Sequence, residues 1–145
     1  MKPRISRELK RYNYLFGETN AAYHQMYLKV GLSDSAAMIL YTILEHGDSC
    51  LLKNICRSTG LSKQTINSAI RKLEAEGIIC LETSGPKNKM VCLTEAGRSL
   101  AERTAGRVIE AENQIFASWT KEDVEKYLEL TEAYANALKE KVKNM

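Results

Sequence analysis

The sequence predicts a mainly α-helical fold with a small β-hairpin wing, the class called the winged helix-turn-helix. Three observations within residues 51–97 support this class. A short amphipathic segment ends in a glycine turn, and a second amphipathic segment with one polar face follows it. Two short runs that contain β-branched residues then flank a Gly-Pro turn. This order gives the second segment one face to bury and one face that stays accessible.

The first helix of this unit is predicted from the spacing of its apolar residues. Leu52, Ile55 and Cys56 fall at i, i+3 and i+4, which places them on one side of a helix. Gly60 can end this helix in the left-handed conformation, because it has no Cβ. Ser62 can cap the next helix, since its hydroxyl accepts a hydrogen bond from a backbone N–H that lacks a helical partner.

The second helix combines a narrow apolar face with a polar face. Ile66, Ile70 and Leu73 share one side by the 3.6-residue period, and Gly77 ends the segment. No acidic residue occurs in this helix before Glu74. Amide side chains pair with adenine and arginine pairs with guanine, so the polar face is a candidate for reading base edges in a DNA major groove. The candidate DNA-binding residues here are Lys63, Gln64, Thr65, Asn67, Ser68, Arg71 and Lys72.

The hairpin is predicted from two short apolar runs, residues 78–83 and 90–93, separated by the sequence SGPKNK. Thr94 then follows as the expected cap of another helix. The tip of the hairpin adds Lys87 and Lys89 to the candidate DNA-binding residues, as contacts to phosphates or to the minor groove.

Two helices are expected before this unit. Residues 4–30 carry an apolar, aromatic-rich stripe at helical spacing, and a glycine closes the segment. A second helix is expected from residue 34 to about residue 46, with Met38, Tyr41 and residues 44–45 near its buried side. The stripe of the first helix consists of Ile5, Leu9, Tyr12, Phe16, Tyr23 and Tyr27.

A long helical region is expected from Thr94, and Thr120 with the acids after it marks the start of a last helix. The apolar stripes at both ends of the chain exceed what one thin winged domain can cover. We therefore expect a homodimer in which two recognition helices meet one palindromic site. The apolar residues after the hairpin are Leu100, Val108, Ala111, Ile115 and Trp119, followed by Val124, Tyr127, Leu128, Thr131, Tyr134, Leu138 and Val142.

Composition bounds the class of protein. The chain has 145 residues, 44% of them apolar and 27% charged, which is typical of one globular domain. Positive charge gathers in residues 53–89, where seven Lys or Arg stand against three acids, and this favours a polyanionic partner. No apolar run approaches the roughly 18 residues of a membrane span, and no signal-peptide pattern is seen, so we expect a cytoplasmic protein without a membrane partner.

No catalytic arrangement is found in the sequence, so we expect no enzyme and no cofactor. His24 and His46 stand apart from other chemistry-bearing residues, and there is neither a phosphate loop nor a nucleophile elbow. The four cysteines, at positions 50, 56, 80 and 92, form no CxxC pair and match no structural zinc spacing. The sequence therefore assigns no metal ligand and favours reduced cysteines that act as small apolar residues.

The chain resembles the MarR family of bacterial winged-helix transcription regulators. The resemblance covers nearly all of the chain and is carried by LSDSAAMILYTIL at 32–44, LLKNICRSTGLSKQTINSAIRKLEAEGII at 51–79 and LTEAG at 93–97. It implies a single domain over 1–145, with a DNA-binding lobe at 32–97 and interlocked dimerisation helices at 1–31 and 98–145. It also implies that the recognition helix enters the major groove and the wing reaches the minor groove.

One departure from the family pattern lies in the wing. The family's wing usually carries an Asp and, two residues later, an Arg. Those positions correspond here to Gly85 and Lys87, so the acid is absent and a lysine replaces the arginine. An ammonium keeps the charge but lacks the planar fork of a guanidinium, which puts the sequence preference of the wing in doubt.

The resemblance favours a ligand-responsive repressor. A small aromatic or amphipathic effector is expected near Tyr12, Phe16 or Tyr23, because tyrosine offers both an apolar ring and a hydroxyl. The same rings can instead fill the dimer core. Two further alternatives stay open: a thiol-oxidation or metal sensor on this fold, and a protein-interaction module that docks a partner through the polar helix face. The acid-free run 63–72 argues against the second.

Overall fold

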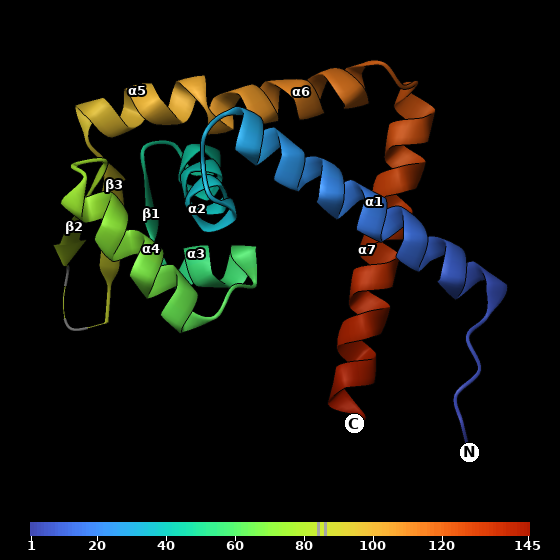
Figure 1. Cartoon of the computed structure of the whole chain (residues 1–145). Coiled ribbons are helices and arrows are strands. Elements are labelled where there is room, and N and C mark those ends of the chain that lie inside the picture. The colour runs from blue at the N-terminus through green and yellow to red at the C-terminus, as the bar shows by residue number, and fades with distance from the viewer. Residues whose placement is uncertain (84, 86) are drawn as a thin grey trace. The chain divides into compact units, whose positions relative to one another are not determined.

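The computed structural model describes residues 1–83, 85 and 87–145 (Figure 1). Two compact units, residues 1–109 and 110–145, are described separately below. Among the described residues no helix is both long enough and apolar enough to cross a membrane. The elements run in the order α1 (Arg7–Lys29), α2 (Asp34–Glu45), β1 (Ser49–Leu51), α3 (Leu52–Thr59), α4 (Lys63–Ala75), β2 (Ile79–Thr83), β3 (Lys89–Leu93), α5 (Glu95–Arg103), α6 (Ala105–Ala117) and α7 (Lys121–Lys143).

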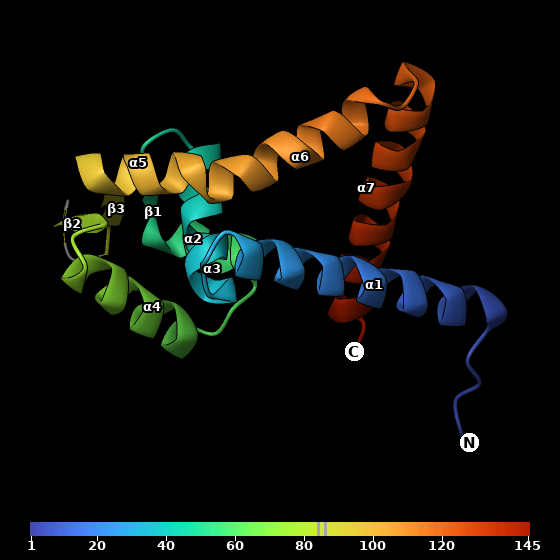
Figure 2. The same cartoon turned by 45° about the horizontal axis from the view of Figure 1, so that its top comes forward.

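The predicted fold class is confirmed: the structure is mainly helical with a small antiparallel sheet. α2 lies between α4 and α5 and contacts both of them (Figures 1 and 2). Ile39, Leu40 and Ile43 of α2 are fully buried, and they share one apolar core with Ile55 of α3 and Val91 of β3. The first unit is therefore organised around α2.

The predicted buried side of α2 was right only in part. Tyr41 and Leu44 are half-buried and pack against the core, whereas Glu45 is exposed and the fully buried residues of the helix were not among those predicted. The reason is that α2 is contacted by α3, α4, α5 and two strands, so its buried surface is wider than the predicted face. The buried residues of α2 are Ala37, Ile39, Leu40, Thr42 and Ile43.

The helix-turn-helix forms as its sequence predicts. Gly60 has φ 68° and ends α3 in the left-handed conformation. The Ser62 hydroxyl accepts a hydrogen bond from the Thr65 N–H at 3.1 Å and so caps α4. Ile66, Ile70 and Leu73 are buried. The caps determine where α4 begins and where α3 ends, and the apolar face determines the orientation of α4 about its own axis.

The wing has one strand more than the sequence predicts. β2 and β3 form the expected hairpin, but the order in the sheet is β1-β3-β2, so β3 is the central strand. β1 pairs with it through Cys50 opposite Val91. Three residues are too few to carry a period-2 pattern, which is why β1 was missed. In the predicted turn, Ser84 and Pro86 lie outside the described residues, while Gly85 has φ 85°.

The LTEAG step joins the end of α4 to the start of α5. The Thr94 hydroxyl donates to the Gly77 carbonyl oxygen at 2.6 Å and accepts from the Gly97 N–H at 2.9 Å. The Thr94 N–H donates to the Ile78 carbonyl oxygen at 3.1 Å. A Cβ on Gly97 would overlap that same Ile78 carbonyl oxygen. Gly97 is thus required by the close approach of two backbone segments.

The helical region after the wing is broken, contrary to the expectation of one long helix. Thr104 has φ −121° and ψ −86°, which lies outside helical values and separates α5 from α6. Thr104 is buried, and its hydroxyl donates to the Leu100 carbonyl oxygen at 2.6 Å. Val108 is buried as predicted, whereas Trp119 lies beyond the end of α6.

The second unit contains the rest of α6 and α7. Thr120 caps α7 as predicted, by accepting from the Asp123 N–H at 3.1 Å. Trp119 lies edge-on to both Phe116 and Tyr127, with ring centroids 5.5 Å and 5.4 Å apart. The packing of these three rings stabilises the connection between the end of α6 and the start of α7.

Replacing Gly97 with alanine should destabilise the protein by about 1–3 kcal/mol, because the new methyl must push the Ile78 backbone aside. Urea unfolding followed by circular dichroism measures this loss. The control is Gly17→Ala in α1, where a Cβ meets nothing within 4 Å and should be neutral or slightly stabilising. Equal stability of the two variants would contradict this account of the LTEAG step.

Candidate nucleic-acid interface

The polar face of α4 is exposed along its whole length. Burial of Ile66, Ile70 and Leu73 turns the opposite side of the helix to solvent. All of the residues predicted for this face from sequence are exposed, and no acidic side chain lies among them. These exposed residues are Lys63, Gln64, Thr65, Asn67, Ser68, Arg71 and Lys72.

The start of α4 differs from the other capped helices in its charge. The first turns of α1, α2, α5 and α7 each contain an acidic residue, which complements the positive end of the helix dipole. The first turn of α4 contains none and begins with Lys63. The N-terminal end of α4 is therefore a locally positive region.

A basic groove of about 400 Å³ lies between α4, the start of α3 and the wing. Its cationic lining comes from Lys53, Lys63, Lys87 and Lys89, and it contains no acidic residue. No described carboxylate forms an ion pair with these four lysines. We call this site the lysine groove. It holds four ammonium groups whose charge is free to attract an anion.

The sequence did not predict that Lys53 lies in the lysine groove. The groove depends on the β1–β3 pairing, in which Leu51 lies opposite Met90, so the start of α3 comes next to the base of the wing. Since β1 itself was not predicted, nothing in the linear sequence connected Lys53 with Lys89. The net positive charge of residues 53–89 was the only available signal.

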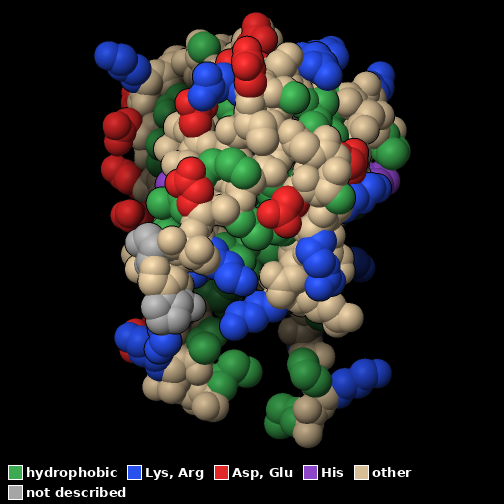
Figure 3. Space-filling view, turned by 90° about the vertical axis from the view of Figure 1, so that its left-hand side faces the viewer, with side chains coloured by type: hydrophobic (Ala, Val, Ile, Leu, Met, Phe, Trp, Pro, Cys, Tyr) green, Lys and Arg blue, Asp and Glu red, His purple; other side chains and the backbone are tan. Residues whose placement is uncertain are grey.

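The wider surface agrees with this charge distribution. Figure 3 looks onto the side of the molecule where Figure 1 shows the wing and α5. Lys and Arg side chains gather in the middle of this face, whereas acidic side chains lie above them and along one edge, and further Lys and Arg side chains lie at the top (Figure 3).

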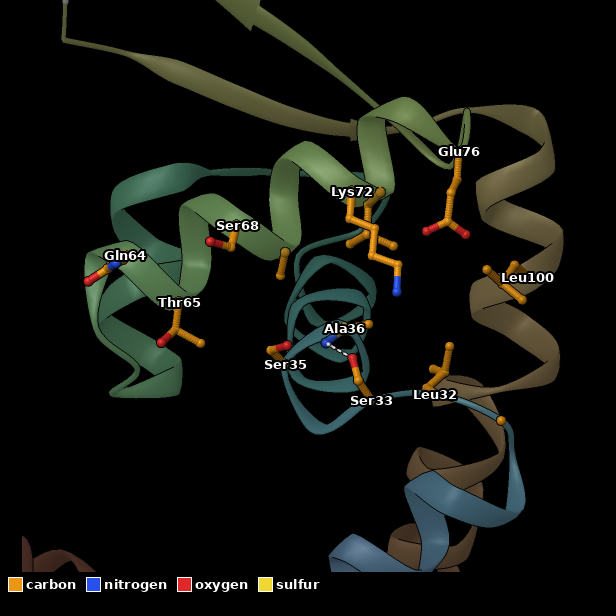
Figure 4. A pocket seen from close by; sticks show the side chains of 13 residues that line it. Leu32, Ser33, Ser35, Ala36, Gln64, Thr65, Ser68, Lys72, Glu76 and Leu100 are labelled. Carbon is orange, nitrogen blue, oxygen red and sulfur yellow. Dashed lines mark hydrogen bonds between the residues drawn. The ribbon is translucent and has the colours of Figure 1, made fainter.

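The other edge of α4 borders a second hollow, of about 580 Å³, shown in Figure 4. Gln64, Thr65, Ser68 and Lys72 line it from α4. Facing them are the turn before α2, the first residues of α2, and a leucine of α5 (Figure 4). Lys63 and Asn67 line the lysine groove instead, and Arg71 lines neither hollow. The predicted reading residues thus divide between two edges of one helix.

The residues predicted to bind an effector all lie on α1, away from both hollows. Tyr12 and Phe16 have ring centroids 5.9 Å apart, and Tyr23 pairs instead with Tyr27 at 6.2 Å. Tyr12 is 41% exposed and Phe16 56% exposed. None of these rings lines the 580 Å³ hollow or the lysine groove. The structure therefore brings the three predicted residues onto one helix without enclosing them in either hollow.

The histidines are engaged in local contacts. His24 Nδ1 lies 2.8 Å from a carboxylate oxygen of Asp34, which links α1 to α2, so His24 does not stand alone as its sequence context suggested. His46 Nδ1 lies 2.9 Å from the Thr42 carbonyl oxygen. These contacts give each ring a structural partner, and neither ring lines the lysine groove.

The four cysteines form no disulfide in the structure. Burial raises the pKa of the Cys50 thiol, and the Glu45 carboxylate adds to the effect. Burial also raises the pKa of the Cys92 thiol, with Glu82 and Cys80 contributing further. Both thiols are held in the protonated form near neutral pH, unlike the low-pKa thiols of peroxide sensors. Cys80, Glu82 and Cys92 nevertheless bring their donor atoms within 4.8 Å of one another, an arrangement that the sequence did not predict.

The chain is similar to known regulators both in sequence and in fold. Residues 30–86 match the model of the MarR family. A MarR family regulator from Neisseria meningitidis is 18% identical, with a TM-score of 0.84 over 96% of this chain and 99% of that chain. MepR of S. aureus, solved in complex with DNA, is 20% identical, with a TM-score of 0.70 over 88% of this chain and 97% of that chain.

A third similar structure is CouR from Rhodococcus jostii RHA1, solved bound to p-coumaroyl-CoA. It is 20% identical, with a TM-score of 0.71 over 92% of this chain and 96% of that chain. No curated protein matches the chain. At these identities the likeness to solved structures establishes a shared fold.

Proposed function

We propose that this chain, which has a winged helix-turn-helix fold and whose residues 30–86 match the MarR family model, is a sequence-specific, DNA-binding transcription regulator. The family resemblance drawn from the sequence is confirmed. The observation that carries the functional proposal is the exposed face of α4, where residues 63–72 offer amides, hydroxyls and cations without an acid. The lysine groove beside it supplies the positive charge that DNA binding requires.

In this proposal α4 enters the major groove. Gln64 and Asn67 present amides that suit adenine, and Arg71 presents a fork that suits guanine. Lys63 and Lys53 neutralise phosphates on the wing side of the helix. An acid-free face also favours DNA over a protein partner, because protein surfaces present cations and anions in similar numbers.

The wing adds contacts of a different kind. Lys87 and Lys89 are exposed and line the lysine groove, so they can reach phosphates or the minor groove. Lys87 is an ammonium at the position where the family usually has a guanidinium, and it cannot make a planar two-pronged contact. We therefore propose that the wing contributes more to the affinity for DNA than to the preference for a base sequence.

The two long terminal helices support the proposal of a homodimer. α1 and α7 have 23 residues each, and neither contains a buried residue. Both expose large apolar side chains, and a second copy of the chain is the cover that a symmetric regulator provides. Two recognition helices about 34 Å apart would then meet a palindromic operator. The exposed apolar residues of these helices include Leu9, Tyr12, Leu15, Phe16, Tyr127, Leu128, Leu130, Tyr134, Leu138 and Val142.

The regulatory role that we propose is that of a repressor released by a small effector. Tyr12, Phe16 and Tyr23 are the proposed binding residues, since their rings and hydroxyls suit an aromatic or amphipathic compound. CouR, which shares the fold, is bound to p-coumaroyl-CoA, a ligand of that kind. A ligand that prefers one spacing of the two recognition helices weakens DNA binding by its difference in affinity, typically about 1–3 kcal/mol.

Replacing Gln64 or Arg71 with alanine should lower operator affinity by about 1–3 kcal/mol and relax preference at one base pair. The operator is first selected from a random duplex pool, and binding is then measured by fluorescence anisotropy. Arg103→Ala, an exposed arginine on α5, serves as the control and should bind normally. The proposal fails if no sequence is enriched, or if both variants bind the selected operator as the parent protein does.

Removing Lys87 and Lys89 together should weaken specific and non-specific DNA about equally. It should also reduce the slope of log affinity against log salt by up to about 2 units, because two phosphate contacts are lost. Titrations at several salt concentrations measure the slope. The double variant Lys139→Ala/Lys141→Ala on α7 removes the same charge elsewhere. An unchanged slope in the wing variant would exclude wing contact with DNA.

Charged substitutions at Leu128 and Leu138 should disrupt the dimer and unfold the chain. Both side chains are about half exposed, at 51% and 54%, on a helix with no buried residue. Sedimentation should give a dimer for the parent protein and an unfolded or aggregated species for Leu128→Lys/Leu138→Lys. The control Glu129→Lys/Glu132→Lys changes exposed charges on the same helix. A parent protein that sediments as a folded monomer would rule out the proposed dimer.

A panel of phenolic acids and lipophilic drugs should contain compounds that release bound operator, with a change in apparent affinity on the order of 5–150-fold. Tyr12→Ala/Phe16→Ala should abolish that response, and sedimentation with an operator titration in the absence of effector tests that the variant is still a dimer that binds DNA. Tyr14→Ala, at a ring 66% exposed on the same helix, is the matched control. Release by peroxide alone would replace the effector with a thiol switch, and release by neither would leave constitutive DNA binding.

A further inference from the structure

The outer face of the wing sheet carries a cluster of soft and anionic donors. Cys80 of β2 lies directly opposite Cys92 of β3 in the antiparallel register. Glu82 is two residues beyond Cys80, so it projects from the same face of the sheet. The residues that alternate with them, Ile79 and Val91, are buried in the core, which confirms that the cluster faces outward.

The spacing of the cluster suits a small tetrahedral cation. One sulfur from each cysteine and one carboxylate oxygen all lie within 4.8 Å of one another. A tetrahedral zinc ion bound at about 2.3 Å to two sulfurs and about 2.0–2.2 Å to one oxygen holds these ligand atoms roughly 3.5–3.8 Å apart. Small side-chain rotations close that difference. Cys80 and Glu82 are exposed, so an ion can enter from solvent and keep a water as fourth ligand.

We propose that Cys80, Glu82 and Cys92 form a binding site for a thiophilic divalent cation such as Zn²⁺ on the outer face of the wing. Two thiolates and one carboxylate supply three negative charges to the ion. Coordination replaces the two thiol protons, which pass to the solvent. The site bridges β2 and β3, so a bound ion ties together the two strands that lead to the wing tip. This site is independent of the proposed DNA binding.

The alternative to a cation site is a disulfide bond between Cys80 and Cys92. Directly paired residues in antiparallel strands have Cα spacings that permit one. A disulfide, however, gives Glu82 no role, whereas a cation uses all three donors. The third donor is therefore the feature that distinguishes the two outcomes.

The test is a titration of the reduced, metal-free full-length protein with Co²⁺, followed by displacement with Zn²⁺. We expect one ion per chain, with the visible absorption of a tetrahedral site and a thiolate-to-cobalt band in the near ultraviolet. Cys80→Ser or Cys92→Ser should abolish the thiolate band. Removing a residue that only hydrogen-bonds to a metal ligand lowers metal affinity by roughly 10–100-fold. Glu82 is proposed as a direct ligand, so Glu82→Gln should weaken Zn²⁺ binding by roughly tenfold or more.

Cys56→Ser and Glu74→Gln are the matched controls, since they alter a thiol and a carboxylate elsewhere in the same unit and should bind normally. Circular dichroism verifies that every variant is folded. The proposal is overturned if the parent protein shows no thiolate–cobalt band, or if Cys80→Ser binds as the parent does. Peroxide-dependent formation of a Cys80–Cys92 disulfide in a protein that binds no Zn²⁺ would also overturn it, in favour of a redox pair.

Discussion

The packing of Ile66, Ile70 and Leu73 into the core beneath α4 is the constraint on which the rest of the structure depends. Burial of each side chain contributes about 1.5–3 kcal/mol, and a rotation of α4 that exposed them would bury Asn67 or Arg71 without partners. The rotation of the helix is therefore determined by its apolar face. Because that rotation is determined, the polar residues are presented to solvent in one arrangement, with one edge towards the wing and the other towards α2.

The elements around α4 hold its two ends. Ser62 caps the start by accepting the Thr65 N–H, while Thr94 accepts the Gly97 N–H and donates to Gly77 just past the end. The same Thr94 caps the start of α5 and follows the last residue of β3, so one side chain connects α4, the wing and α5. The lysine groove is a product of this arrangement, because β1 pairing with β3 places the start of α3 beside the wing.

Local signals predicted most of this fold. Gly60 and Ser62 act through their immediate neighbours, as does Thr94 where it caps α5, so these roles were visible in the linear sequence, as was the 3.6-residue period of α4. The bond from Thr94 to Gly77 spans 17 residues and was not visible. What depends on long-range pairing was not visible. The three residues of β1 carry no period, and the buried surface of α2 is decided by the several elements that surround it. The Cys80–Cys92 pair and the contribution of Lys53 both arise from strand register, which no short sequence window contains.

The central position of β3 has a consequence for the order in which the chain acquires its structure during synthesis. β1 and β2 leave the ribosome first, yet neither pairs with the other, and each finds its hydrogen-bonding partner only when residues 89–93 emerge. The segment recognisable by its family likeness ends at residue 86, before that strand. A nascent chain of that length therefore has the helix-turn-helix sequence but two unpaired strand edges. The three-stranded sheet therefore cannot form before residues 89–93 are available.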